Sequence, residues 1–397
     1  MPSRVTIIGS NFAGFTAAIE LKKHLKDEVE ITVISKSPDF LFMPSLIWLP
    51  FGLRKRADIT FPLAPIYADH GVQFVQSTVT GLDLPNRRVE HSGGVTEHDY
   101  LVIATGPVNH WAAVPGLGPD GFTQSIFGID DAERAGAAFE AFLADPGPVV
   151  IGAVQGAACF GAAYEFLFNF AHQLKKRGLK DKVELTYLSA EPFLAHFGIG
   201  GFGNGTAMTE MFFKHEGIKG VTNASVKEVR AGEIELGDGR VLPFSYAMLA
   251  PAFRGVAAVA AVPEITNPSG FVEVLDTYQT RAYPEVYAAG VAVALAPPEP
   301  TPVPCGVPKT GYLSEEMAKV VVHNIVADLH GAPKVGLPPG AIDAKCILDA
   351  GNNGIIMSAD HLLEPRSHAW LIPGPEAHWA KLAFEKYFLT TRRRGWV

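Results

Sequence analysis

The sequence predicts an α/β protein with two Rossmann-like dinucleotide-binding domains and a small C-terminal domain. A chain of 397 residues is too long for one ordinary hydrophobic core, so more than one domain is expected. Two segments, one starting at Val5 and the other at Val149, each have the pattern of a strand, a glycine turn and a helix. The composition, 48% hydrophobic and 19% charged, is that of a globular chain, so both segments can lie in packed domains.

The first segment predicts a βαβ unit at the N-terminus. Residues 5–8 form an apolar run that stops at Gly9, which is typical of a buried parallel strand. The spacing of apolar residues predicts a helix over residues 14–25, and residues 29–35 have the pattern of a second strand. The second segment repeats this order. It predicts a strand over residues 149–151, a turn over 152–156, a helix over 157–174 and a strand over 183–188.

The chain is then expected to return to the first domain. Residues 279–289 lead to a turn at Gly290, and a proline-rich loop over 297–308 precedes a long helix predicted over 311–329. We expect this helix to pack on the first domain. The predicted domains are residues 1–115 together with residues 266–331, residues 116–265, and a C-terminal domain of residues 332–397 that ends in an aromatic and basic helix.

Charge and cysteine content exclude several classes of protein. The formal net charge of −8 argues against a nucleic-acid partner. No apolar run approaches the roughly 20 residues needed to span a bilayer, and the N-terminus runs directly into a strand, so no signal peptide is expected. Three cysteines without a CxxC motif do not predict a disulfide framework, a zinc site or any other metal site.

The first glycine turn resembles a dinucleotide fingerprint. It contains Gly9 for the tight turn and Gly14 for helix–strand packing, and a pyrophosphate would lie at the helix N-terminus. Asn11 replaces the second glycine, and asparagine tolerates a positive φ better than most residues. Ser35 stands where an acidic residue commonly ends the second strand. An ordinary βα turn is the alternative interpretation of this motif alone.

Two further segments indicate that the dinucleotide is FAD. Residues 100–106 resemble the strand that lies beside the cofactor in two-domain flavoproteins of the disulfide-reductase type. Residues 287–290 resemble their second flavin motif, with Val291 in place of the usual aspartate. The predicted FAD-binding residues are Gly9, Asn11, Phe12, Ala13, Gly14, Ser35, Lys36, Pro44, Val79, Ala104, Thr105, Gly106, Gly290, Val291, Lys309 and Thr310. The turn over 152–157 carries no acidic or basic residue suited to a ribose, so we interpret the second domain as a degenerate NAD-type domain.

Nearly the whole chain resembles the sulfide:quinone oxidoreductases and the related flavoprotein subunit of flavocytochrome c sulfide dehydrogenase. The resemblance rests on residues 40–45, 152–165, 304–312 and 379–388, of which the Pro-Lys-Thr-Gly-Tyr stretch beside Cys305 is the most specific. It implies oxidation of sulfide to sulfane sulfur or polysulfide, with the electrons passing through FAD to a membrane quinone.

In that family two cysteines face each other over the flavin, and the resemblance places them at Cys159 and Cys305. A disulfide offers HS⁻ an electrophilic sulfur, and thiolate exchange supplies the step. Cys159 is expected near the start of its helix, where the helix dipole favours a thiolate; a buried, small hydrophobic residue is the alternative. Cys346 matches no redox cysteine and is expected to be structural.

The sequence departs from the family pattern at several positions. A third cysteine found in many quinone-linked members falls at Phe127, and a histidine often found just after it falls at Asp131. A cysteine near Met43, which attaches the flavin in the cytochrome-linked branch, is also missing. These differences predict non-covalent FAD.

Glu165 and His196 are the acid–base candidates, and either could move protons from H₂S; the alternative for each is a satisfied buried polar group. Glu165 lies six residues after Cys159, so it is expected to face the edge of the flavin while Cys159 faces the ring. Lys309 is expected to stabilise negative charge on the reduced flavin.

Residues 379–389 and the arginines that follow suit a membrane interface. By the resemblance this helix lines the quinone pocket. Lys381 and Phe384 are three residues apart and are expected to share a face, with Lys381 near a quinone carbonyl, Phe384 against the ring and Tyr387 as further lining. A core-packing helix is the alternative. We expect a peripheral membrane protein, able to form a homo-oligomer, on the cytoplasmic face of the inner membrane, or on the periplasmic face if a leader has been removed.

Three other functions stay open at this point. A cytochrome c-linked sulfide dehydrogenase subunit fits the two-cysteine pattern, but would need a haem partner. An NADH:quinone reductase should have a cleaner second glycine turn and gives Cys159 no purpose. A non-catalytic flavin-binding sensor of sulfide or redox state is compatible with the missing third cysteine.

Overall fold

The computed structural model describes residues 1–397 and contains a parallel five-stranded sheet built from both ends of the chain. Its strand order is β19-β9-β1-β2-β5. The strands are β1 (Ser3–Ile8), β2 (Val29–Ser35), β5 (Gln73–Gln76), β9 (Tyr100–Ile103) and β19 (Val286–Ala288). The first four lie within residues 3–103, whereas β19 follows the whole second domain and completes the edge of the sheet. The α/β fold with two Rossmann-like units is confirmed.

Helices α1 (Phe12–Leu25) and α8 (Gly311–Leu329) pack along each other beside this sheet. The bounds of α8 agree with the prediction, and its return to the first domain is confirmed. Thr310 caps α8 because its side-chain oxygen accepts a hydrogen bond from the Leu313 N–H at 3.3 Å. Helix α1 begins two residues earlier than predicted, inside the glycine turn.

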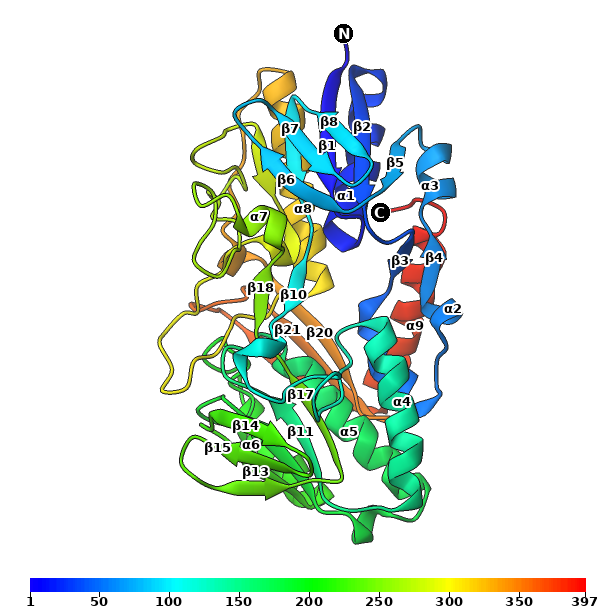
Figure 1. The fold of residues 1–397 in the computed structure, drawn as a ribbon, viewed down its shortest axis with the longest axis vertical. Helices are drawn as coiled ribbons and strands as arrows, with labels where there is room; N and C mark the ends of the chain where they lie inside the picture. Colours follow the sequence, from blue (N-terminus) through cyan, green and yellow to red (C-terminus); the bar gives the residue numbers. More distant parts are fainter.

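A second parallel sheet, in the order β13-β12-β11-β17, forms the core of the second domain. Its strands are β11 (Val149–Ala153), β12 (Leu185–Ser189), β13 (Ile218–Val221) and β17 (Tyr246–Ala250), and its helices are α4 (Ile129–Ala144), α5 (Phe160–Lys176) and α6 (Gly205–Glu216). Phenylalanine rings fill the space between the helices, including Phe139, Phe166 and Phe170. Figure 1 shows the two sheets at opposite ends of the long axis of the molecule.

The second-domain helix was predicted to start at residue 157, which is wrong by one turn. Helix α5 begins at Phe160 because residues 156 and 157 bond instead to the loop before α8. Gly156 N–H donates to the Pro304 carbonyl at 2.6 Å, and the Ala157 carbonyl accepts from Gly306 N–H at 2.8 Å. A backbone held by another loop cannot also form the first helical turn.

Small antiparallel sheets and short helices complete the fold. The three-stranded sheets are β6 (Val79–Asp83), β7 (Arg88–His91) and β8 (Gly94–Glu97); β14 (Val226–Arg230), β15 (Glu233–Leu236) and β16 (Val241–Pro243); and β20 (Ala344–Asp349), β21 (Gly354–Ala359) and β22 (Ala369–Gly374). The two-stranded pairs are β3 (Asp39–Leu41) with β4 (Thr60–Pro62), and β10 (Pro107–Asn109) with β18 (Phe253–Gly255). The short helices are α2 (Arg56–Ile59), α3 (Ala64–Asp69) and α7 (Ala257–Ala260), and a 3₁₀ helix spans Met43–Phe51. None of the helices combines the length and the apolar character that crossing a membrane requires.

The last helix, α9 (Pro375–Arg392), packs on β20 and β21 between the two larger domains (Figure 1). Its buried face carries three charged residues four and seven positions apart, and each is paired with a different part of the chain. Lys381 Nζ lies 2.5 Å from Glu165 Oε1 on α5, Glu385 Oε2 lies 2.6 Å from Arg54 Nη2, and Arg392 Nη2 lies 2.8 Å from Glu315 Oε1 on α8. Helix α9 therefore joins both domains through buried ion pairs.

Replacing Arg392 by alanine should destabilise the protein by about 3 kcal/mol, because it leaves the buried Glu315 carboxylate without its partner. The double variant R392M/E315L should recover most of that loss, since both charges are then removed. Lys319→Ala, which breaks the exposed Lys319–Glu316 pair on the same helix as Glu315, is the control and should cost less than about 1 kcal/mol. Thermal unfolding midpoints measure all three. Equal losses for the single and double variants would contradict this account.

Candidate functional site

The turn between β1 and α1 closes tightly on the end of β9. Gly9 has a φ of +101°, and a Cβ at this position would lie 2.2 Å from the carbonyl oxygen of Ala104. Gly14 faces Gly9 across the turn, where a Cβ would lie 2.0 Å from the Gly9 carbonyl oxygen. The structure thus brings together three predicted site residues at the carboxyl edge of the sheet, where nucleotides bind in such folds.

Asn11 is the N-cap residue of α1, with φ −91° and ψ −160°. Asn11 has an extended backbone with a negative φ, so this turn does not depend on the tolerance of asparagine for a positive φ. Its side-chain Oδ1 is buried and has no hydrogen-bond partner, and no side chain caps the helix. A buried amide oxygen without a partner, beside free N–H groups at a helix N-terminus, suits a ligand that carries both hydroxyl groups and a pyrophosphate.

Gly290 brings the second predicted flavin motif to the same place. Its φ is +73°, and a Cβ there would lie 3.0 Å from Ser314 Oγ on α8 and 3.1 Å from the Ala13 Cβ on α1. Phe12 packs equally close to Gly311, since a Cβ on Gly311 would lie 2.7 Å from its ring. The N-termini of α1 and α8 therefore meet beside the turn after β19, and their positive dipole ends lie near one another.

Lys309 is half-buried at the N-terminal end of α8. Its Nζ donates to the carbonyls of Val293 at 2.7 Å and Val291 at 3.2 Å, and it lies 3.6 Å from the centre of the Phe271 ring. Burial lowers the pKa of Lys309 to about 7, and a negative charge on Cys159 would act in the opposite direction. Lys309 can therefore gain or lose a proton near neutral pH.

The other predicted cofactor residues differ in how exposed they are. Ser35 is buried and its Oγ accepts a hydrogen bond from Ser10 Oγ at 2.8 Å. Lys36 is exposed, Pro44 is half-buried, and Val79 is half-buried at the start of β6. Thr105 and Gly106 follow β9 directly at half-buried positions.

The segments that carry Cys159 and Cys305 lie side by side. The two backbone hydrogen bonds between residues 156–157 and residues 304–306 hold them together, and a Cβ on Gly306 would lie 2.9 Å from the Ala158 Cβ. Cys159 is the N-cap residue of α5, Cys305 is buried in the loop before α8, and both are free thiols. The two thiols therefore belong to neighbouring segments from distant parts of the chain, and the charge of Lys309 acts on Cys159.

The expected thiolate at Cys159 is wrong for this state of the protein. Burial raises the pKa of Cys159 to about 12, although Lys309 acts to lower it, and burial raises the pKa of Cys305 to about 11. The position at a helix N-terminus was predicted correctly, but loss of water around the sulfur outweighs the helix dipole.

Glu165 was expected to face the flavin edge, and the structure instead pairs it with Lys381. Glu165 Oε1 lies 2.5 Å from Lys381 Nζ and accepts a hydrogen bond from the Asp349 N–H at 2.7 Å. Burial raises the pKa of Glu165 to about 7, while Lys381 acts to lower it. An acid–base candidate and a quinone-site candidate are therefore one buried pair.

His196 is buried beside the glycine-rich loop of residues 198–203. Its Nδ1 accepts a hydrogen bond from Gly198 N–H at 3.1 Å, and its Nε2 lies 3.9 Å from Glu299 Oε1, too far for a hydrogen bond. Burial lowers the pKa of His196, so the neutral ring is favoured. Gly198 also touches the Cys305 loop, because a Cβ there would lie 1.9 Å from the Gly306 carbonyl oxygen.

The predicted shared face of Lys381 and Phe384 is only partly correct. Lys381 lies at the centre of the buried face of α9, whereas Phe384 lies at its border and is 42% exposed; Tyr387 is 65% exposed. Phe384 still contacts the interior, since its ring centre lies 5.9 Å from Phe42, and Phe42 lies 4.9 Å from Phe388. Phe388 in turn lies 5.3 Å from Phe12, so a series of tilted aromatic rings in contact runs from the helix surface to the first glycine turn.

The chain is similar to known proteins over its whole length. Residues 3–305 match the family model described as pyridine nucleotide-disulphide oxidoreductase. The sulfide-quinone reductase of Aquifex aeolicus (strain VF5) is 36% identical over 402 residues, which cover 100% of this chain and 92% of the relative. The crystal structure of the sulfide:quinone oxidoreductase from Aquifex aeolicus superposes with a TM-score of 0.95 at 36% identity and covers 99% of this chain and 92% of that chain.

The chain belongs to the sulfide-quinone reductase family. More distant likenesses show the fold alone: the structure of NDH2 from Plasmodium falciparum has a TM-score of 0.73 at 14% identity and covers 97% of this chain and 94% of that chain. Membership of this family implies an FAD cofactor, and the residues around the Gly9 turn and the N-termini of α1 and α8 fit it. The closed Gly9 turn, the unpartnered Asn11 oxygen and the two helix N-termini match a flavin dinucleotide in chemistry and position.

Two departures from the family pattern have structural roles of their own. The Phe127 ring, where a third cysteine was expected, lies 6.0 Å from the Phe253 ring and covers the core of the second domain. Asp131 accepts a hydrogen bond from Arg134 Nη2 at 2.6 Å.

Sequence reasoning missed Asp349, Trp48 and His378, which lie around Glu165. Asp349 is completely buried and accepts hydrogen bonds from Trp48 Nε1 at 2.9 Å, while its other oxygen lies 2.6 Å from His378 Nδ1. An aspartate between an apolar strand and a glycine is also an ordinary turn signal, so the pattern around residue 349 could not distinguish a buried site from a surface turn.

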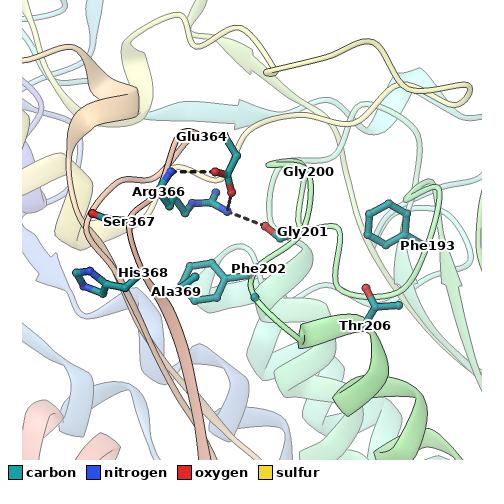
Figure 2. Close-up of a pocket in the computed structure, with 11 residues that line it drawn as sticks. Phe193, Gly200, Gly201, Phe202, Thr206, Glu364, Arg366, Ser367, His368 and Ala369 are labelled. Atoms are coloured by element: carbon teal, nitrogen blue, oxygen red, sulfur yellow. Dashed lines mark hydrogen bonds and ion pairs between the residues drawn. The ribbon is translucent and has the colours of Figure 1, made fainter.

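A separate cavity of about 500 Å³ lies between residues 200–203 and residues 364–369 (Figure 2). Its lining contains none of the predicted site residues. Arg366 dominates it, but its guanidinium donates to the Gly201 carbonyl at 3.0 Å and pairs with Glu364 at 3.0 Å, as Figure 2 shows. These contacts join the glycine-rich loop to the loop between β21 and β22 and leave the guanidinium occupied.

Replacing Gly9 by alanine should abolish flavin binding, because the new Cβ would lie 2.2 Å from the Ala104 carbonyl oxygen and would force the turn open. Gly52→Ala is the matched control: Gly52 also has a positive φ, +69°, but its Cβ would meet open space. The measurement is the flavin absorbance of the purified proteins relative to their protein absorbance. A Gly9→Ala protein that keeps its full flavin content would refute the assignment of this turn.

Proposed function

We propose that this protein oxidises hydrogen sulfide to sulfane sulfur or polysulfide and passes the electrons through FAD to a quinone. Membership of the sulfide-quinone reductase family over the whole chain supports the reaction. The observation that carries the residue assignment is the pair of backbone hydrogen bonds that holds the Cys159 and Cys305 segments together beside Lys309.

The sulfur chemistry needs these two cysteines in their oxidised form. HS⁻ attacks one sulfur of a Cys159–Cys305 disulfide, a new S–S bond forms, the original bond breaks, and one cysteine becomes a persulfide while the other leaves as a thiolate. Attack by further sulfide on the persulfide releases sulfane sulfur and returns the pair to two thiols. Bound FAD would accept two electrons from this thiol pair and deliver them to quinone.

The neighbouring residues can handle the protons of this cycle. Because burial favours the neutral form of His196, its ring can accept the proton of H₂S as the substrate enters. Lys309 is poised near neutral pH and can take the proton that the Cys159 thiol loses when it is reoxidised. Both residues belong to loops that touch the Cys305 segment or face Cys159.

Nicotinamide chemistry has little support in the second glycine turn. Gly156 N–H is bonded to the Pro304 carbonyl, and Ala157 N–H is bonded to Val154. The Gln155 amide bonds both backbone groups of Val226 at 2.9 Å. The N–H groups that would hold a pyrophosphate are therefore occupied by the protein itself, which supports the degenerate NAD-type interpretation.

Cys159→Ser should abolish bleaching of the flavin by sulfide under anaerobic conditions, because the disulfide can no longer form, while chemical reduction by dithionite should still bleach it. Wild type should bleach and then recover its absorbance when a short-chain quinone is added. Cys346→Ala is the control and should bleach normally. Bleaching without recovery would favour a cytochrome-linked subunit or a sensor, and bleaching by NADH but not by sulfide would refute the proposal.

We further propose that β22 and the outer face of α9 bind the membrane surface, where quinone is dissolved. Trp370 and Ile372 alternate on β22 and are both exposed, and Trp379 and Tyr387 are exposed on α9. Arg393 and Arg394 follow directly. Exposed tryptophan and tyrosine beside arginine are typical of a protein surface that lies in the headgroup region.

The double variant W370A/W379A should lose most of its binding to vesicles of anionic lipid, measured by co-sedimentation, while sulfide still bleaches its flavin. Met211→Ala, which removes an equally exposed apolar side chain on α6, should bind as wild type does. Unchanged binding by the double variant would exclude this surface as the docking site.

A further inference from the structure

Glu191 is a buried carboxylate that follows β12 and is bonded on both of its oxygens. Its Oε2 accepts hydrogen bonds from Ser189 Oγ at 2.8 Å, Tyr164 Oη at 3.0 Å and Tyr187 Oη at 3.1 Å. Its Oε1 accepts a hydrogen bond from the Phe197 N–H at 2.7 Å. Because Glu191 and the two tyrosines are almost completely buried, bulk water does not replace any of these bonds.

The position of Glu191 resembles that of the acidic residue that bonds a ribose in dinucleotide-binding folds. That residue follows the second strand of the βαβ unit, and β12 is the second strand here. A carboxylate has roughly four acceptor positions, and four protein donors already occupy those of Glu191. Glu191 therefore has no acceptor left for a ribose hydroxyl, and its bonds serve the protein itself.

Two of the bonds in this cluster fix the backbone on either side of His196. The Ala195 N–H donates to Tyr164 Oη at 2.8 Å, and the Phe197 N–H donates to Glu191. Ala195 has a φ of +61° and Phe197 a φ of +54°. Left-handed backbone is costly for a residue with a Cβ and persists only where the surrounding structure holds it. The cluster thus keeps His196 in a conformation that the loop alone would not favour.

This conformation keeps the His196 ring dry and close to the sulfur loop. The ring is buried, and its Nε2 has no hydrogen-bond partner. Burial lowers the pKa of His196, and Glu299, whose Oε1 lies 3.9 Å from Nε2, opposes this effect. A Cβ on Gly198 would lie 1.9 Å from the Gly306 carbonyl oxygen, so the same loop packs tightly against the segment that carries Cys305. Movement of the loop would therefore admit water to the ring.

We propose that Glu191 and Tyr164 are positioning residues that hold His196 in place to accept the proton of H₂S. This inference rests on the proposed function, in which His196 accepts that proton. Both residues act through the backbone of the loop, Tyr164 through the Ala195 N–H and Glu191 through the Phe197 N–H. A carboxylate that would otherwise bind a ribose here serves the sulfur site.

The hold depends on hydrogen-bond acceptors and not on charge. Burial raises the pKa of Glu191 to about 7, whereas the Phe197 N–H and the Ser189 hydroxyl lower it. A protonated carboxyl group still offers an oxygen to the Phe197 N–H, so the loop stays fixed in both states. Burial also raises the pKa of Tyr164 and of Tyr187 well above the usual value, so both hydroxyls keep their protons.

Tyr164→Phe and Tyr187→Phe form a matched pair. Each removes one buried hydroxyl from Glu191 Oε2, but only the Tyr164 hydroxyl also holds the Ala195 N–H. NMR of the holoprotein with isotope-labelled histidine follows the titration of His196, whose signal is the one missing in His196→Gln. In Tyr164→Phe water reaches the released ring, so the midpoint should rise by about one pH unit toward the usual histidine value. In Tyr187→Phe it should stay at the wild-type value.

Two substitutions of Glu191 test whether the acceptor is what matters. Glu191→Gln keeps an oxygen for the Phe197 N–H, so the His196 midpoint should stay close to that of wild type. Glu191→Ala leaves this N–H without an acceptor, so the midpoint should rise as it does in Tyr164→Phe. A role in packing alone would not make the glutamine variant differ from the alanine variant in the titration of a neighbouring histidine.

Stopped-flow bleaching of the flavin by sulfide joins the position of His196 to the reaction. Tyr164→Phe and Glu191→Ala should lower the rate constant of bleaching about tenfold at saturating sulfide, because a displaced base accepts the proton less well. The acidic limb of the pH profile should move to higher pH, since the ring must be neutral to accept a proton. Glu191→Gln should restore most of the rate, and reoxidation by quinone should keep its wild-type rate in all four variants.

Equal shifts of the His196 midpoint in the two tyrosine variants would overturn the inference. An unchanged midpoint in both Tyr164→Phe and Glu191→Ala, or bleaching at the wild-type rate in both, would overturn it as well. If Glu191→Ala does not fold, the pair of tyrosine variants decides. Failure of sulfide to bleach wild type would refute the proposed function separately, because the NMR titration needs neither substrate.

Discussion

Two backbone hydrogen bonds between the turn after β11 and the loop before α8 determine the arrangement of the functional site. They join segments about 150 residues apart. They also occupy backbone groups of residues 156 and 157, which therefore cannot form a first helical turn, so α5 starts at Phe160. They also place Cys159 and Cys305 in neighbouring segments, and they bring the chain to Lys309 and the N-terminus of α8. One local contact thus occupies the backbone of the second glycine turn and joins it to the Cys305 loop.

Burial has a consistent effect on the ionisable groups of the site. It lowers the pKa of Lys309 and raises that of Glu165, so that both approach 7 from opposite sides. The same loss of water holds Cys159 and Cys305 as thiols. Groups whose pKa values lie near the working pH exchange protons most effectively, so the dry interface between the domains provides acid–base chemistry that exposed side chains of the same type would lack.

What the sequence could predict follows from the range of the interactions. The bounds of β2 and α8 were predicted correctly because an apolar run and a threonine cap are local signals. The start of α5 was not, because it depends on a loop far along the chain. The pairing of Glu165 with Lys381 was missed for the same reason: each residue has a local pattern, but their distance is a property of the packed domains. The fully buried Asp349 resembles an ordinary turn residue in sequence.

Helix α9 shows most clearly why pattern alone was insufficient. A surface helix usually buries its apolar residues and exposes its charges. Here the buried face carries Lys381, Glu385 and Arg392, each neutralised by a partner from another element, and the exposed face carries Trp379 and Tyr387. The inner charges are stable only because three separate segments supply their counter-charges. The outer aromatic rings would be removed from water only by an apolar partner. The lipid surface proposed above is such a partner. Phe384, at the border between the two faces, connects the exposed side of the helix with the aromatic rings that lead to the first glycine turn.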